Sequence, residues 1–108
     1  MSKPKPGAKK YMTPEARRDQ LFNEAWDQAV AHGLKGVTRV SVTEVVGISA
    51  PMVNVHFGGI DALRKLLVER AVAERNVDVV ADALALGIAV EGASQKLLKE
   101  ARRLAEAA

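Results

Sequence analysis

The sequence predicts an all-α protein, in which a three-helix domain containing a helix-turn-helix precedes two C-terminal helices that form a dimer interface. Apolar residues recur at helical spacing along most of the chain, and glycines fall where the periodic segments end. No long stretch alternates apolar and polar residues, as a half-buried sheet would. The 108 residues fit one domain in size. We divide them into an arm at 1–12, the helix-turn-helix domain at 13–59 and the C-terminal helices at 60–108.

The N-terminal segment, residues 1–12, is unsuited to a core because it holds four Lys, two Pro and a single aromatic residue. It is expected to be a flexible basic arm. Residues 1–59 carry eight Lys/Arg and five Asp/Glu, a net charge of +3, whereas residues 60–108 carry eight of each. A localised positive charge suits a polyanion such as nucleic acid, although a solvated tail that aids solubility explains it equally.

The first periodic segment predicts a helix from about Pro14 to His32. Thr13 is a suitable N-cap, and proline is favoured at the first helical position. The apolar stripe of this helix consists of Leu21, Phe22, Ala25, Trp26, Ala29 and Val30. Gly33 is expected to end the helix, because glycine readily adopts the conformations found at helix C-termini.

The segment from Val37 to Val46 is ambiguous, since its valine content favours a strand by propensity. Its spacing favours a helix, because Val42, Val45 and Val46 share a helical face and Thr38 can cap it.

Gly47 ends that segment, and a second short helix is predicted from Ala50 to about Phe57, with Ser49 as its cap. The pair Gly58-Gly59 ends this helix. A short helix, a turn containing glycine and another short helix make a helix-turn-helix.

Residues 60–86 contain no Gly or Pro, and they predict one helix of about 25 residues, roughly 38 Å long. Two apolar stripes run along it, so it is expected to pack both against its own domain and against a partner. A final helix is predicted at about 93–107, with leucine and alanine on one side. The expected interface between two copies of the chain consists of Val72, Val79, Ala83, Leu97, Ala101 and Leu104.

The second short helix carries the residues that we expect to read DNA bases. In a helix-turn-helix this helix enters the major groove, and its N-terminal residues contact base edges. Val53 and Phe57 share the face that must meet the core. The expected base-reading residues are Ala50, Pro51, Met52, Asn54 and Val55. Exposed Met and Val side chains would meet thymine methyl groups, and asparagine can either bond a phosphate or pair with adenine. If the helix is rotated differently, the Met and Val side chains belong to the core instead.

Residues 47–57 resemble the turn and recognition helix of the TetR family of repressors, whose pattern is roughly Gly-Val-Ser-x-x-x-Leu-Tyr-x-His-Phe followed by a helix carrying Leu. The resemblance covers about residues 14–70. The matching positions are Gly47, Ser49, His56, Phe57 and Leu63, with Ile48 and Val53 as conservative matches. The first helix, Gly33 and Thr38 also fall where the family pattern has them. The resemblance implies a dimeric transcriptional repressor that binds a palindromic operator.

Two departures from the family pattern concern contacts with DNA phosphates. Asn54 replaces the usual Tyr, and Gly58, Gly59 and Ile60 stand where a Lys usually follows. We expect other groups to compensate. The residues expected to bind phosphate are Thr38, Arg39, Ser49, His56, Lys9, Lys10, Arg17 and Arg18. The two arginines fit equally well as solvated residues of the first helix, and the histidine as an ordinary residue at a helix end.

Chain length is a further departure, because members of the family usually carry an additional ligand-binding domain. The chain stops at Ala108, so we expect no small-molecule inducer, and a protein co-regulator becomes a candidate partner. Two other functions fit the sequence. One is a protein-interaction module, in which Met52 and Val55 bind a partner helix. The other is a non-specific architectural DNA-binding protein that relies on the arm.

Catalysis, metal binding and membrane insertion find little support in the sequence. The chain has no Cys and only two His, far apart, which does not make a metal or nucleophile site. We therefore expect no enzyme activity, no metal and no cofactor. We also expect no membrane partner, because no apolar run is long enough to span a bilayer and the N-terminal segment lacks the apolar stretch of a signal peptide. The expected location is the bacterial cytoplasm, at the nucleoid through DNA binding.

Overall fold

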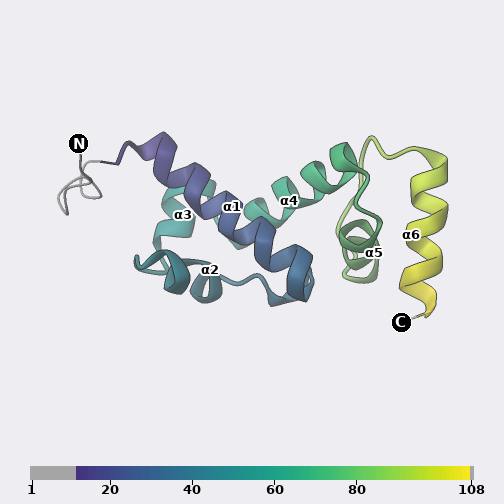
Figure 1. Cartoon of the computed structure of the whole chain (residues 1–108), viewed down its shortest axis with the longest axis horizontal. Helices are drawn as coiled ribbons and strands as arrows, with labels where there is room; N and C mark the ends of the chain where they lie inside the picture. Colours follow the sequence, from purple (N-terminus) through teal and green to yellow (C-terminus); the bar gives the residue numbers. More distant parts are fainter. Residues whose placement is uncertain (1–11, 108) are drawn as a thin grey trace, which may run out of the picture.

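The computed structural model describes residues 12–107, and helices account for all the regular structure in this range (Figure 1). The elements in chain order are α1 (Pro14–His32), the 3-10 helix η2 (Leu34–Gly36), α2 (Arg39–Val46), α3 (Met52–Phe57), α4 (Ile60–Glu74), α5 (Val77–Ala85) and α6 (Gln95–Ala107). The predicted all-α class is confirmed for these residues. Helices α1 to α4 pack together, and α5 and α6 form one end of an elongated molecule (Figure 1).

Helix α1 begins and ends where the sequence predicts. Thr13 Oγ1 accepts a hydrogen bond from the Ala16 N–H at 3.0 Å, and Pro14 occupies the first turn. Gly33 ends the helix with a φ of 90°, and its N–H donates to the Ala29 carbonyl. Four of the six residues of the predicted apolar stripe are buried; Phe22 is half-buried, and the last member, Val30, is 52 % exposed.

The ambiguous segment after Val37 is helical. Thr38 caps α2, because its Oγ1 accepts from the Ser41 N–H at 3.0 Å while Ser41 Oγ accepts from the Thr38 N–H at 2.9 Å. This reciprocal pair satisfies two N–H groups at the helix start, where no intrahelical acceptor exists. Gly47 ends α2 in the left-handed conformation, with a φ of 88°. Local capping therefore outweighs the strand propensity of the valines.

The predicted buried face of α2 is partly wrong. Val42 is fully buried and Val46 is half-buried, but Val45 is 65 % exposed. Thr43 is buried instead, and its hydroxyl donates to the Arg39 carbonyl at 2.6 Å. Because this bond satisfies the hydroxyl within the helix, threonine can occupy an interior position that the apolar pattern does not reveal.

The single long helix predicted at 60–86 is wrong, because the chain breaks at Arg75 and Asn76. Arg75 has a left-handed φ of 56°, and Asn76 Oδ1 accepts from the Val79 N–H at 3.1 Å, which caps α5. Asparagine is a strong N-cap. The prediction of one long helix rested on the absence of Gly and Pro, so it placed no helix start at Asn76. The result is two helices, α4 and α5, which contact each other.

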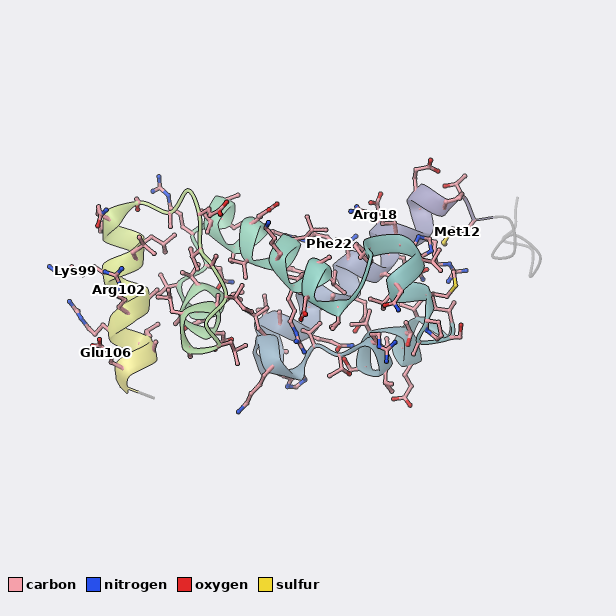
Figure 2. All side chains as sticks on the ribbon, turned by 180° about the vertical axis from the view of Figure 1, so that it is seen from behind. Met12, Arg18, Phe22, Lys99, Arg102 and Glu106 are labelled. Carbon is pink, nitrogen blue, oxygen red and sulfur yellow. The ribbon has the colours of Figure 1, made fainter. Side chains whose placement is uncertain are left out.

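Helix α6 packs against α5, at the end of the molecule far from α3 (Figure 1). It begins at Gln95, slightly later than predicted, and Ser94 Oγ accepts from the Leu97 N–H at 3.1 Å. Leu97 is buried, whereas Lys99 and Arg102 point away from the rest of the molecule (Figure 2). Helix α6 is thus an amphipathic cover for α5.

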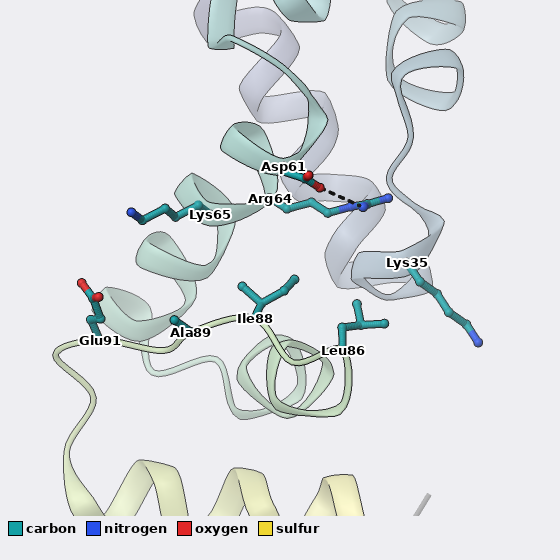
Figure 3. A pocket seen from close by; sticks show the side chains of 8 residues that line it. All are labelled: Lys35, Asp61, Arg64, Lys65, Leu86, Ile88, Ala89 and Glu91. Atoms are coloured by element: carbon teal, nitrogen blue, oxygen red, sulfur yellow. Dashed lines mark ion pairs between the residues drawn. The ribbon is translucent and has the colours of Figure 1, made fainter.

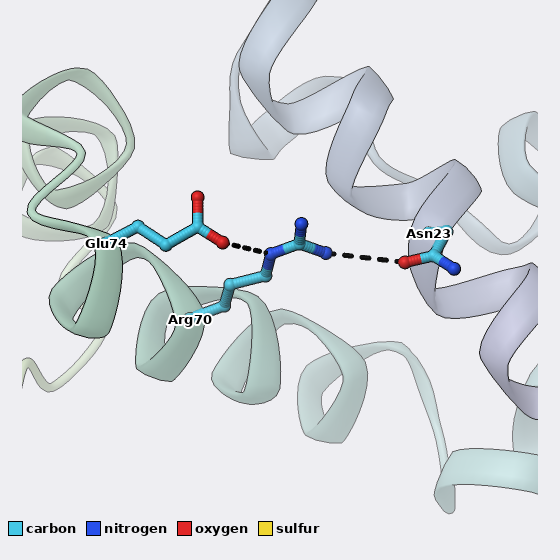
Figure 4. A network of polar contacts seen from close by, with 3 residues as sticks. All are labelled: Asn23, Arg70 and Glu74. Atoms are coloured by element: carbon cyan, nitrogen blue, oxygen red, sulfur yellow. Dashed lines mark hydrogen bonds and ion pairs between the residues drawn. The ribbon is translucent and has the colours of Figure 1, made fainter.

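A polar network joins α4 to α1 over the aromatic part of the core. Arg70 donates from Nε to Glu74 Oε2 at 2.8 Å and from Nη1 to Asn23 Oδ1 at 3.4 Å (Figure 4). Its guanidinium also lies 4.5 Å from the Trp26 ring centroid and 5.8 Å from that of Phe22, close enough for cation-π attraction. The network holds α4 on α1, the helix against which α3 also packs.

Candidate nucleic-acid interface

Helices α2 and α3 both pack against α1 and are joined by a turn at Gly47. The Gly47 and Ile48 N–H groups both donate to the Thr43 carbonyl, at 2.8 and 3.0 Å, which closes the end of α2. Helix α3 is anchored by Val53, which is fully buried, and by Phe57, which is half-buried against the core. The prediction that these two side chains face the core is confirmed.

The opposite side of α3 is open to solvent. Pro51 and Asn54 are exposed, and Val55 is 71 % exposed, the highest value among the large apolar side chains of residues 12–107. Ala50 and Met52 are half-buried at the edge of this face. The alternative in which Val55 is a core residue is therefore wrong, and Met52 is only partly available.

Helix α3 begins at Met52, so the predicted start at Ala50 with Ser49 as its cap is wrong. The Ser49 carbonyl accepts from the Met52 N–H at 3.0 Å, and the Ala50 carbonyl accepts from the Val53 N–H at 3.2 Å. These bonds span three residues and form a tighter turn ahead of the helix, with Pro51 in the N-cap position. The N–H groups of Met52 and Val53 are therefore already paired and are not free to bind a phosphate.

Arg18 holds the end of α3 in place from α1. Its Nε donates to the His56 carbonyl at 3.3 Å, and its guanidinium lies 4.7 Å from the Phe57 ring centroid. Figure 2 shows Arg18 on this side of the molecule. The sequence predicted either a phosphate contact or a solvated position. In the structure Arg18 positions α3. Helical spacing does not reveal this role, because Arg18 and His56 are 38 positions apart in the chain.

The imidazole of His56 is less accessible than a phosphate contact requires. The residue is half-buried, and its Nε2 is buried without a hydrogen-bond partner among the described residues. In this arrangement Nε2 is not available to a phosphate.

Three of the other predicted phosphate-binding residues lie on the surface around α2 and α3. Arg39 is exposed at the first position of α2, and Ser49 is exposed in the turn before α3. Thr38 is also exposed, but its hydroxyl already accepts the Ser41 N–H. Arg39 and Ser49 are thus the members of this group best placed to meet a phosphate.

The remaining predicted phosphate contacts lie near the N-terminus. Arg17 is half-buried, and its Nη1 donates to Gln20 Oε1 at 3.2 Å, a bond within the first turns of α1. Lys9 and Lys10 lie outside the described residues, so their predicted role stays a prediction.

Most of the predicted dimer-interface residues are covered by the chain itself. Four of the six are buried: Val79, Ala83, Leu97 and Ala101. Their burial follows from the break between α4 and α5, because it lets α5 and α6 pack on each other within one chain. Val72 is half-buried, and Leu104, at 43 % exposure, is the member of the set that remains on the surface.

Residues 12–107 hold no group of three or more His, Cys, Asp or Glu placed to bind a metal ion. Within the same part of the chain, no helix combines the length and apolar character needed to cross a membrane. Comparison of the chain with protein families, curated proteins and solved structures finds no match. The exposed side of α3 is the feature on which a functional assignment rests.

Proposed function

We propose that this protein is a sequence-specific DNA-binding transcriptional regulator, most simply a dimeric repressor, whose helix-turn-helix is formed by α2 and α3. The observation that carries the proposal is the outer side of α3, where Asn54 and Val55 are exposed on a helix anchored from behind by Val53. An amide beside an apolar group matches the major groove, where adenine offers a donor and an acceptor and thymine offers a methyl group.

The size of α3 supports a dimer as the binding unit. The helix has six residues, so it is roughly 9 Å long at about 1.5 Å per residue. A helix of this length fits the major groove but reaches only a few base pairs. Specific binding in the usual affinity range therefore needs two copies, arranged about a two-fold axis on a palindromic operator.

Charge and sequence pattern agree with this function. The excess of basic residues lies in the first 59 residues, the half of the chain that contains α3, and such an excess attracts the phosphate backbone. The resemblance of residues 47–57 to the TetR pattern supports repression as the mode of action. The proposal includes no catalytic activity, and a regulator of this kind would work in the cytoplasm, at the nucleoid.

Selection of bound DNA from a random pool by the full chain, followed by gel-shift titration, tests the proposal. We expect enrichment of a palindrome that binds at least ~10³-fold more tightly than random DNA. A much lower ratio would indicate an architectural DNA-binding protein. Failure to bind any DNA at physiological salt would favour a protein-interaction module, and either result would contradict the proposal.

The Val55→Asp variant tests the orientation of α3. A carboxylate on the outer side of this helix would face DNA phosphates, so we expect about tenfold or greater loss of operator affinity, equivalent to at least ~1.4 kcal/mol. Val30→Asp is the matched control, because Val30 is also exposed but lies in the last turn of α1. Circular dichroism checks that both variants fold, and equal losses in the two would contradict the placement of α3 in the groove.

A further inference from the structure

A cavity of about 430 Å³ lies between α4 and residues 86–91, which follow α5 (Figure 3). Small-molecule sites commonly enclose about 300–1,000 Å³, so its volume is sufficient for a ligand. None of the candidate DNA-contact residues within 12–107 lines it. The cavity is therefore a feature separate from the proposed DNA-binding surface.

Arg64, on the α4 side of the cavity, has few partners for its guanidinium. Its Nη2 donates to the Val37 carbonyl at 2.8 Å, and its Nε is buried without a partner in the described part of the chain. Its Nη1 lies 3.7 Å from Asp61 Oδ1, which is too long for a hydrogen bond, and the Asp61 side chain is 97 % exposed. Water weakens an ion pair with so exposed a partner.

This guanidinium is therefore short of acceptors, although its own side chain is mostly buried. The Arg64 side chain is only 24 % exposed, and a guanidinium has five N–H donors that prefer planar, paired oxygens. A carboxylate supplies such oxygens, with Nη1 as the donor that lacks a close acceptor. Lys35 and Lys65 also line the cavity, against the acidic residues Asp61 and Glu91, so the charged lining has a formal net charge of +1.

The opposite wall of the cavity is apolar. It consists of Leu86, Ile88 and Ala89, from the segment that joins α5 to α6 (Figure 3). Leu86 is 43 % exposed and is one of the large apolar side chains that the described chain leaves uncovered. An apolar group that filled this space would remove the wall from water, a favourable transfer that scales with the area covered.

We propose that this cavity binds a small carboxylate with an apolar tail, whose charged end pairs with Arg64 and whose tail lies on Ile88 and its neighbours. Both halves of the ligand follow from the lining: an under-partnered cation on one wall and an apolar surface on the other. The sequence predicted no small-molecule inducer, and that prediction rested on chain length alone. It could not take account of this cavity, because the cavity is formed by residues that the fold brings together.

Calorimetric titration of the full chain with 4-phenylbutyrate tests the proposal, with two matched probes. The amide 4-phenylbutyramide keeps the tail and lacks the charge, and acetate keeps the charge and lacks the tail. We expect saturable one-to-one binding of the carboxylate and at least about tenfold weaker binding of each matched probe. Absence of saturable binding, or equal affinity for the amide, would overturn the proposal. Tighter binding of inorganic phosphate than of 4-phenylbutyrate would overturn the role of the apolar wall.

Ala89→Glu locates the ligand in this cavity, because it adds a carboxylate to the wall at an exposed position. We expect about tenfold or greater loss of 4-phenylbutyrate affinity. Ala85→Glu is the control, an exposed alanine at the end of α5 that is outside the lining, and it should bind as the unsubstituted chain does. Unchanged binding by Ala89→Glu would place the ligand elsewhere. No DNA is present in these titrations, so their outcome is independent of the proposed DNA binding.

Discussion

Within α3, Val53 is fully buried, whereas the next two residues, Asn54 and Val55, are exposed. The rotation that buries Val53 therefore decides which side chains lie on the surface that we propose contacts DNA bases. Arg18 supports this rotation from α1, because it bonds the last turn of α3 through the His56 carbonyl. Arg18 therefore helps to position α3, and this role is separate from its predicted contact with a DNA phosphate.

Asn54→Ala is expected to weaken binding to the selected operator by about 1–3 kcal/mol and to relax the preference at one base pair of each half-site. The side chain is exposed, so the fold should be unaffected. Gel-shift titration against operators changed at each position in turn measures both effects. Gln95→Ala, an exposed amide on α6, is the control. An unchanged base preference would remove Asn54 from the base-reading set.

Gly33→Ala is expected to lower the free energy of unfolding by about 1–3 kcal/mol. Gly33 has a φ of 90°, and a Cβ there would lie 3.2 Å from Asp82 Oδ2. That oxygen also accepts the Leu34 N–H at 3.2 Å, which limits its retreat. Gly36→Ala is the control, because its Cβ would make an ordinary 3.5 Å contact with His32, and we expect a change within about 0.5 kcal/mol. Urea denaturation measures both, and equal losses would contradict the strain at Gly33.

At the scale of helices, the sequence predicts an element well where its end carries a local signal. Thr13 and Thr38 cap helices as predicted, and Gly33 and Gly47 end them. The break at residues 75–76 is not predicted, because nothing in the sequence distinguishes an arginine in the left-handed conformation from an ordinary polar residue of a helix. Its position is set jointly by the Asn76 cap and by the packing of α5 on α4 and α6.

For the candidate site, too, the sequence predicts the features that belong to a single helix and misses the contacts between distant segments. Apolar periodicity predicts that Val53 and Phe57 face inward and that Asn54 faces outward, and these are properties of one helix. The bond from Arg18 to His56 joins segments distant in the chain, and so does the cavity between Arg64 and the segment that holds Leu86 and Ile88. Such contacts depend on the packed structure, so spacing along the sequence does not reveal them.

Asn76→Ala is expected to destabilise the protein by about 1 kcal/mol, because the Val79 N–H loses its acceptor at the start of α5. Asn76→Asp, which keeps a side-chain oxygen for the same bond, should retain most of the stability. Urea denaturation followed by circular dichroism compares the two variants. If the aspartate variant loses as much stability as the alanine variant, the cap is not what stabilises this break.

The whole molecule places α3 and α6 toward opposite ends of its long axis (Figure 1). A symmetric dimer on B-DNA must hold its two recognition helices about 34 Å apart, or at a multiple of that spacing. Contact between two copies through the α6 end would keep their α3 helices well separated. The apolar surface available for it includes Leu104, whereas Leu97 and Ala101 are occupied within the chain.

Leu104→Asp is therefore the informative dimer variant. Leu97→Asp would disturb the packing of α6 on α5, since Leu97 is 5 % exposed, but Leu104 is 43 % exposed and its replacement should leave the protomer folded. We expect sedimentation velocity to show monomers at concentrations where the unsubstituted chain is dimeric, and operator affinity to fall with dimer content, because each protomer then presents a single α3. Lys99→Asp, on the outward side of α6 (Figure 2), should leave the dimer intact. A dimer that persists in Leu104→Asp would move the interface away from this turn of α6. Equal dissociation of both variants would indicate that charge, rather than apolar contact, holds the copies together.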